Sequence, residues 1–550
     1  MTEMSRNCHP PRMSATFAFQ PVLRPALPTV FGPLEYHTQR EIFERMDAIL
    51  SASGLESEFI TAAIANQKPD FAKRSAKRKQ RFALFSIVCL RANIARSLLG
   101  LAHRDFCARL ADSPLLQWFV HVGDLAVMKT FAKSTSQRFE SWVSVASMRR
   151  INDQLIALCA VPTAPVAPVA VEAAAVAASE GTVASSSEHK IAPFGLAEPV
   201  DFSDAYLDTT ALKAPIHFPT DWVLLCDAAR TLMKATLCIR RAGLRARMAQ
   251  APEEFLREMN KAAMAMSAQR RKKDSKRQRK AILRSMKKQV SRIAAHARSH
   301  LEALHTRRSE TSLSEGQAKQ IERRIENILT QLPAAVKQAH ERLIGGRQVD
   351  NADKILSLYD RSVQVIIRGK ASAEVEFGSK ITLMEIGNGM VIDYCLHLDN
   401  IADSNTPASS LKRLPGSITE LIRSMWGDRG THSAANEKLL EKHGIKSGLC
   451  PRSPGELARR MQEEPGMKAG LKRRGSTEAR IAIFKNVFMG NPGKGRSFEA
   501  REKACGWCVL THNLWVLARL PQTKAKPQPA PAQPSAGQWR STPRAAKAAA

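Results

Sequence analysis

The spacing of apolar residues divides the chain into regions of different character. Within residues 1–160 apolar side chains recur every three or four positions, which predicts a helical domain. Residues 161–190 carry Ala, Pro, Val and Ser without that spacing, and such a composition is typical of a linker. Helical spacing returns over residues 222–347. A serine-rich triplet, 134–136, precedes a helix predicted at 137–148 and is expected to cap it.

The pattern is strand-like in two parts of the chain. A short extended segment that contains Asp208 follows the linker and ends at two prolines. After about residue 345, segments rich in β-branched residues alternate with glycine turns, which predicts three strands in an antiparallel meander. Two shorter strands are expected farther on, the first carrying Asp428 at its end. The segments after the helical region are 363–367, 373–383, 390–396, 425–431 and 444–450.

Helical spacing also appears between and after these strands. The predicted helices lie at about 417–425 and 432–443, around Glu478, and at 508–520. Residues 521–550 consist largely of Pro, Ala, Gln and Lys, and we expect them to be disordered.

The chain has 550 residues, enough for two to four domains, with 83 Lys and Arg residues against 51 Asp and Glu residues. The net charge of +32 predicts a polyanionic partner, because cations on phosphates release counterions. An anionic membrane surface is the alternative, but no apolar run approaches the ~18–20 residues of a membrane-spanning helix. The first residues lack the apolar segment of a secretion signal. We therefore expect a cytoplasmic protein that does not enter the membrane.

The positive charge is densest in one run that contains eight basic residues and a single acid. A solvated helix face is the usual interpretation of such a run. Like charges four residues apart weaken a helix, however, and a bound phosphate backbone would relieve their repulsion. We therefore expect nucleic-acid contact in this run. Its basic residues are Arg270, Arg271, Lys272, Lys273, Lys276, Arg277, Arg279 and Lys280.

The ten cysteines are scattered through the chain, which favours reduced thiols in a reducing compartment. Cys505 and Cys508 have the spacing of a zinc or redox pair, but no second pair of ligands accompanies them. Because they adjoin an apolar segment, we interpret them as buried thiols.

Three carboxylates occur in an order that indicates a shared site. Asp208 lies on the first strand, Asp428 ends a later strand and Glu478 lies on a late helix. In an RNase H-like sheet, acids in this order meet because neighbouring strands bring distant residues together. Each acid also has a simpler interpretation. Asp208 and Asp428 could belong to plain turns, and Glu478 could form a surface pair with Arg474 or Arg480.

Three sequence blocks contain these acids. They are Asp208-Thr209-Thr210 followed by IHFPTD at 216–221, then Gly427-Asp428-Arg429-Gly430, and last an R-x3-E-x6-K spacing kept by Arg474, Glu478 and Lys485. In this order the blocks resemble those of insertion-sequence DDE transposases of the ISNCY kind, within the broader IS-four-like group. The resemblance covers roughly residues 200–520.

The resemblance implies an α+β/α fold and the following domains. An RNase H-like catalytic domain would occupy residues 191–520, with a basic helical insertion at 235–347. Outside the resemblance, the composition of the helical domain at 1–160 favours DNA binding, and a plain packed helical bundle is the alternative. The implied activity is that of a DNA transposase, which cleaves element ends and transfers them to target DNA.

The chemistry of that activity explains the residue types. Two divalent ions about 3.5–4 Å apart activate the nucleophile and stabilise the leaving oxygen in such displacements at phosphorus. Mg²⁺, or Mn²⁺, prefers carboxylate oxygen, so Asp208, Asp428 and Glu478 are the expected catalytic residues and metal ligands. Arg474 and Lys485 would hold phosphate nearby. The expected partner is double-stranded DNA, bound by a homo-oligomer in the bacterial cytoplasm, at the nucleoid.

The sequence departs from the family pattern at four positions, Lys213, Pro215, Thr431 and Leu471. The departures at Lys213, Pro215 and Thr431 motivate an alternative, an element-derived DNA-binding protein that no longer cleaves. A third hypothesis is an unrelated helical protein that binds RNA or a membrane surface. Its only support is the net positive charge of the chain.

Overall fold

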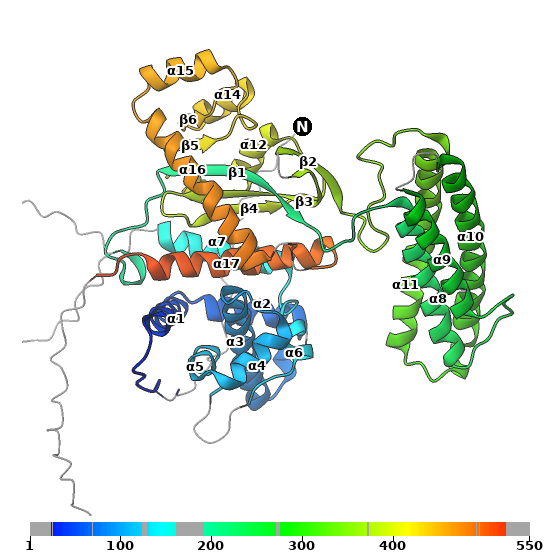
Figure 1. Cartoon of the computed structure of the whole chain (residues 1–550). Helices are drawn as coiled ribbons and strands as arrows, with labels where there is room; N and C mark the ends of the chain where they lie inside the picture. Colours follow the sequence, from blue (N-terminus) through cyan, green and yellow to red (C-terminus); the bar gives the residue numbers. More distant parts are fainter. Residues whose placement is uncertain are drawn as a thin grey trace, which may run out of the picture.

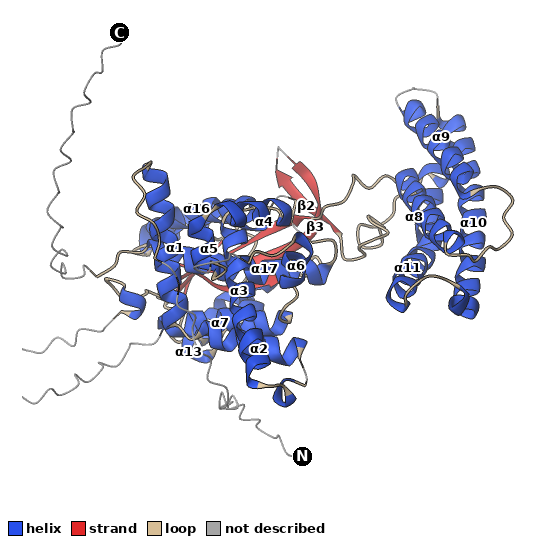
Figure 2. Cartoon of the chain, turned by 90° about the horizontal axis from the view of Figure 1, so that it is seen from below, coloured by secondary structure: helices blue, strands red, loops and turns tan. Residues whose placement is uncertain are grey.

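In the computed structural model of the chain, the described residues are 24, 26–68, 70–123, 129–160, 192–270, 275–370, 373–490, 492–493 and 495–523. The predicted linker at 161–190 and most of the predicted tail at 521–550 lie outside them. The described part is mainly helical and contains one mixed sheet, which makes it an α+β protein (Figures 1 and 2).

The described residues before 161 form seven α-helices, as the apolar spacing predicts. These are α1 (Leu34–Ala52), α2 (Leu55–Gln67), α3 (Ala76–Leu98), α4 (His103–Asp112), α5 (Pro114–Val120), α6 (Lys133–Phe139) and α7 (Val145–Ala160). Their buried side chains belong to the same apolar cluster as one face of the sheet. No described helix is by itself long and apolar enough to cross a membrane, although the bent pairs α1–α2 and α3–α4 pass that test together.

The helix predicted at 137–148 is wrong, because the chain breaks between α6 and α7. Ser144, in the break, accepts a hydrogen bond from the backbone N–H of Ser147 at 3.1 Å. This hydroxyl satisfies one of the free amides at the start of α7. The predicted capping triplet at 134–136 lies inside α6 instead.

The described strands form one six-stranded sheet (Figure 1). Its strands are β1 (Asp204–Lys213), β2 (Gln364–Lys370), β3 (Ala373–Ile386), β4 (Val391–Leu396), β5 (Ser424–Gly427) and β6 (Lys446–Leu449). The central strand β1 pairs antiparallel with β3 and parallel with β5, and β6 continues the parallel side. Both β2 and β4 pair antiparallel with β3, which confirms the predicted meander.

Side-chain alternation along β1 decides what each face of the sheet contacts. Leu207 points into the cluster shared with the N-terminal helices. Tyr206 and Leu212 point to the other face, where they pack against the C-terminal helical segments. These segments are α16 (Met467–Ile483) and its π-helical extension η6 (Phe484–Met489), followed by α17 (Phe498–Arg519). The helix α17 contributes side chains to both clusters, and in Figure 1 it runs between the sheet and the N-terminal helices.

Between β1 and β2 the chain leaves the sheet and forms a four-helix bundle, drawn in green in Figure 1. The helices are α8 (Asp221–Arg241), α9 (Pro252–Arg270), α10 (Lys276–Arg307) and α11 (Glu315–His340). Together they enclose an apolar core of their own. The bundle starts at Asp221 rather than at 235, because Trp222 and Leu225 already pack in that core.

Shorter helices follow the meander, namely α12 (Thr406–Arg413), α13 (Gly416–Thr419), α14 (Ala434–Lys442) and α15 (Pro454–Glu463). The helix predicted at 417–425 is reduced to α13, because Met425 pairs with β1 as part of β5. Strand pairing here overrides the helical spacing. Cys505 and Cys508 are buried in α17, as predicted.

The predicted disordered tail begins with ordered residues. The backbone N–H of Ala197 donates to the carbonyl of Pro521 at 2.9 Å, and Leu196 and Gln522 form an antiparallel bridge. The backbone N–H of Thr523 donates to the carbonyl of Gly195 at 2.9 Å. These bonds hold the chain beyond α17 against the segment that leads into β1.

A buried ion pair fixes the chain where it returns from the bundle to the sheet. The guanidinium of Arg501, on α17, is fully buried and pairs with Asp360, just before β2. It also donates to the hydroxyls of Ser362 at 2.8 Å and Ser379 at 3.3 Å. One charged group thus ties α17, the returning segment and β3 together.

We predict that Arg501→Met destabilises the protein by about 3–5 kcal/mol, because it leaves the Asp360 carboxylate buried without a counter-charge. Urea unfolding measures the loss. Adding Asp360→Asn to Arg501→Met should recover part of it, since the uncompensated charge is then gone. Lys503→Met on the same helix removes only an ion pair with the exposed Glu499 and should change stability by less than about 1 kcal/mol.

Candidate active site

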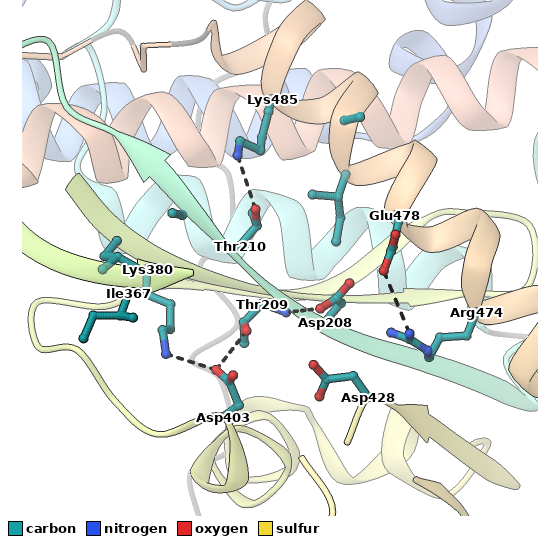
Figure 3. A pocket seen from close by; sticks show the side chains of 14 residues that line it. Asp208, Thr209, Thr210, Ile367, Lys380, Asp403, Asp428, Arg474, Glu478 and Lys485 are labelled. Carbon is teal, nitrogen blue, oxygen red and sulfur yellow. Dashed lines mark hydrogen bonds and ion pairs between the residues drawn. The ribbon is translucent and has the colours of Figure 1, made fainter. Parts of the chain in front are cut away.

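One cavity of about 400 Å³ brings together the five residues that the sequence assigns to catalysis and phosphate binding. Figure 3 shows it at the surface where β1, the end of β5 and α16 meet. The predicted residues that line it are Asp208, Asp428, Arg474, Glu478 and Lys485. Residues far apart in the sequence therefore share one site, as the order of the three acids predicts.

Asp208 reaches the cavity because it lies on the face of β1 that is turned toward α16. It shares that face with Tyr206 and Leu212, whose packing fixes the strand. The backbone N–H of Thr209 donates to its Oδ1 at 2.7 Å. Figure 3 shows the carboxylate of Asp208 opposite that of Asp428.

The surroundings of Asp208 oppose its ionisation. Burial, first, and then the neighbouring charge of Asp428 raise the pKa of Asp208 from 3.8 to about 6. Glu478 raises this pKa further, whereas the Thr209 N–H and Arg474 lower it. Neither Asp208 nor Asp428 forms an ion pair within 4.0 Å among the described residues, although the chain has 83 basic residues.

Asp428 is placed by the parallel pairing of β5 with β1. Tyr206 is the partner of Trp426, so two residues farther along both strands Asp208 and Asp428 lie side by side. Thr431 holds the turn that follows. Its backbone N–H donates to Oδ1 of Asp428 at 3.0 Å, and its hydroxyl donates to the Asp428 carbonyl at 2.7 Å. Thr431 is thus a structural support of the acid.

Glu478, Arg474 and Lys485 come from one helical segment above the sheet (Figure 3). Glu478 is 62% exposed and lies 3.9 Å from Arg474, one turn earlier. Lys485 lies in the π-helical η6 rather than in α16, and its ammonium donates to the hydroxyl of Thr210 at 3.3 Å. The acid and both cations face the cavity together.

The rotation of α16 is fixed by a buried carboxylate that the sequence did not reveal. Glu385 of β3 accepts a hydrogen bond from Thr477 at 2.8 Å, and the guanidinium groups of Arg473 and Arg480 lie 3.5 Å from it. Arg473 also donates to the carbonyl of Gly387 at 2.6 Å. Because Thr477 immediately precedes Glu478, this contact turns the catalytic candidate toward the cavity.

A fourth acid lines the cavity and was also missed. Asp403 accepts hydrogen bonds from the hydroxyl of Thr209 at 2.9 Å and from the ammonium of Lys380 at 3.0 Å. A Cβ on Gly430 would lie 3.1 Å from Asp403 and 3.2 Å from Asp428, so these two acids lie close together. Asp403 lies in a polar loop without a distinctive spacing, so no sequence signal was available.

The donor set fits hard divalent cations. The cavity presents oxygen ligands from four carboxylates, and the two central ones have no basic partner. Among the described residues, His305, Glu322 and Glu326 of the bundle form the group whose ligand atoms all lie within 4.8 Å of one another. Within the part of the chain that the structure describes, the acids of the cavity do not form such a group. His305 already pairs with Glu322 at 2.9 Å on an exposed surface.

The predicted basic run lies in the bundle and not around the cavity. Arg270 ends α9, and Arg271, Lys272 and Lys273 lie outside the described residues. Lys276, Arg277, Arg279 and Lys280 form the first turns of α10. Among the described residues, the structure therefore divides the predicted basic residues between the cavity, which Arg474 and Lys485 line, and a separate helical surface.

Comparison of the chain with known protein families, with curated proteins and with solved structures finds no match in any of the three. The site is therefore interpreted from its own geometry.

We predict that Asp208→Asn stabilises the metal-free protein above about pH 6 by roughly 1–3 kcal/mol. A carboxyl whose pKa rises on folding, here from 3.8 to about 6, resists ionisation in the folded state. The gain should shrink as the pH falls below about 6 and should vanish below about pH 3, where the acid is protonated in both states. Urea unfolding in EDTA across this range measures it. A gain that is independent of pH, or one shared by the exposed control Asp399→Asn, contradicts the prediction.

Proposed function

We propose that the protein is a DNA transposase that cleaves and transfers DNA strands with divalent metal ions. The observation that carries the proposal is the pair Asp208 and Asp428, which face each other in the cavity without a basic partner. A cation from outside the chain would relieve their repulsion. Bound Mg²⁺ or Mn²⁺ would supply Lewis-acid activation of the attacking oxygen and stabilise the leaving oxygen.

The strand order supports an RNase H-like assignment for the sheet. Omitting β2, the order is β4-β3-β1-β5-β6, with β3 antiparallel to β1, and β5 and β6 parallel to it. The first acid lies on β1, the second follows the fourth strand of this set, and the third lies on a helix that packs across the sheet. This is the order of acids that the RNase H-like expectation requires.

The protein residues would act as follows. Asp208, Asp428 and Glu478 would hold the ions. Glu478 is exposed, so it can turn from Arg474 toward the centre of the cavity. Arg474 and Lys485 would then contact the phosphate that is being cleaved. Lys380, held by Asp403, adds a third cation at the wall of the cavity.

The partners follow from the same assignment. Element ends and target DNA would be bound as duplexes by a homo-oligomer, because two ends must be held together, and the reaction belongs to the bacterial cytoplasm. The N-terminal helices are candidates for recognising the element ends. There α3 and α4 turn through 105° across a four-residue connection, a geometry compatible with a helix-turn-helix.

The alternative, a DNA-binding protein that no longer cleaves, rests on the departures from the family pattern. The structure gives these positions roles that do not disturb the acids. Lys213 lies five residues from Asp208, about 17 Å along the strand, and pairs with Glu376 at 3.6 Å. Pro215 lines a separate cavity of about 450 Å³. Thr431 supports Asp428 directly, so we favour the active enzyme.

We predict that purified protein nicks labelled element-end DNA in Mg²⁺, and that Asp208→Asn, Asp428→Asn and Glu478→Gln each lower the rate by roughly a hundredfold or more. Such a loss corresponds to about 3 kcal/mol of lost transition-state stabilisation, within the range for a catalytic metal site. The exposed acids Asp399 and Glu420 provide matched controls, and their amide variants should cleave at the wild-type rate.

Metal binding is measured separately from cleavage. Mg²⁺ should raise the unfolding midpoint of the wild-type protein and of the controls, but not that of Asp208→Asn, because a ligand stabilises only the state that binds it. Equal nicking by wild type and the three site variants, or DNA binding by all without nicking by any, would reject the catalytic proposal.

A further inference from the structure

The solvent side of α10 carries a row of cations that extends well beyond the basic run seen in the sequence. Five exposed residues form this row, which we name the α10 basic face: Arg277, Arg284, Lys288, Arg292 and Arg298. At 3.6 residues per turn the first four lie within roughly a quarter of the helix circumference. They lie opposite Met286 and Ile293, which are buried in the bundle core.

Acids of the bundle leave this row uncompensated. Within the described residues, none of the five cations has a carboxylate within 4.0 Å, and the ion pairs of α10 involve only His305 and Arg307 near its end. The single acid of α10 is Glu302. The nearby acid of α9, Glu258, accepts a hydrogen bond from Gln289 instead.

Folding of the helix does not account for the row. Arg284, Lys288 and Arg292 follow one another at intervals of four residues, a spacing at which like charges destabilise a helix. The helix forms because its opposite side is buried in the bundle core. Solvation of the helix surface does not require charges of one sign, because a mixture of acids and bases would be solvated equally well. The repulsion within the row therefore indicates a partner that neutralises it.

We propose that the α10 basic face binds the phosphate backbone of double-stranded DNA without reading its sequence. Arg277 and Arg298 lie 21 positions apart, about 32 Å along the helix, which is close to one turn of a B-form duplex. Duplex phosphates supply a dense line of negative charge along that length. The choice of DNA as the polyanion rests on the proposed function.

The residues between the cations fit backbone contact. Ala281, Ser285, Ser291 and Ala295 are exposed on the same side of α10, and their small side chains allow a phosphate backbone to approach. Single-stranded nucleic acid is bound largely by stacking of bases on aromatic rings. The α10 basic face has no aromatic side chain, which favours the duplex.

The test compares two variants with the same change in net charge. The face variant carries Arg277→Gln, Arg284→Gln, Lys288→Gln and Arg292→Gln. The control variant carries Lys438→Gln, Lys442→Gln, Lys468→Gln and Lys472→Gln, all exposed residues outside the bundle. Binding to a labelled duplex of random sequence is measured over a salt series in EDTA, which prevents cleavage, and circular dichroism checks the helix content of both.

We expect the face variant to bind at least tenfold more weakly than wild type. Its slope of log affinity against log salt should be smaller by roughly 3–4, since each phosphate contact contributes about 0.9. The control variant should keep the wild-type slope. Equal slopes for the two variants, or tighter wild-type binding to single-stranded DNA or RNA of the same length, would overturn the proposal.

The result is separable from the proposed function. The same comparison in an Asp208→Asn background should show the same change in slope, because the α10 basic face acts without the cavity. If the wild-type protein never nicks DNA but the face variant still shows the smaller salt slope, only the catalytic proposal is rejected. If the wild-type protein nicks DNA and the face variant binds DNA with the wild-type affinity and salt slope, only the inference about α10 is rejected.

Discussion

The parallel pairing of β5 with β1 is the constraint on which the site depends. It sets Asp208 and Asp428 side by side, and the burial of Asp208 next to that second acid raises its pKa to about 6. The helix α16 packs against both paired strands and covers the face of β1 on which Asp208 lies. Glu385, on the strand at the other side of β1, then fixes the rotation of α16 through Thr477. The third acid is therefore positioned by the two strands that flank the first.

The charges of the molecule are sorted rather than mixed. A chain of net charge +32 leaves its two central acids without a basic partner, while Arg474, Lys380 and Lys485 stand around the same cavity. A cluster of acids inside a ring of cations attracts both a divalent ion and the phosphate that the ion contacts. The opposite arrangement occurs on α10, where cations gather and Glu302 is the single acid. Under the proposed function, these two surfaces would contact different parts of one DNA partner.

The sequence predicted the parts of this site that depend on local pattern and on the order of blocks. The shared cavity of Asp208, Asp428 and Glu478 could be predicted because the sequence pattern indicates the strands and the helix that carry these acids. Glu385 and Asp403 were not predicted, since their roles arise from strand pairing and loop packing that no local spacing encodes. Strand pairing also explains why the helix predicted at 417–425 is wrong. Met425 pairs with β1, and this pairing overrides the helical spacing of the segment. Contacts across the sheet therefore limited the prediction more than the assignment of elements did.

The position of the insertion explains why the site tolerates it. The chain leaves the sheet after Lys213, at the end of β1 remote from the pairing with β5, and comes back at Gln364. At the return, Asp360 meets Arg501, so the incoming strand is fixed by a buried ion pair with α17 and not by the bundle. The bundle has its own apolar core, and its described residues add no side chain to the lining of the cavity. Because the bundle is attached in this way, its surface charge can change without moving the acids of the cavity. The row of mutually repelling cations on α10 is therefore compatible with an intact site.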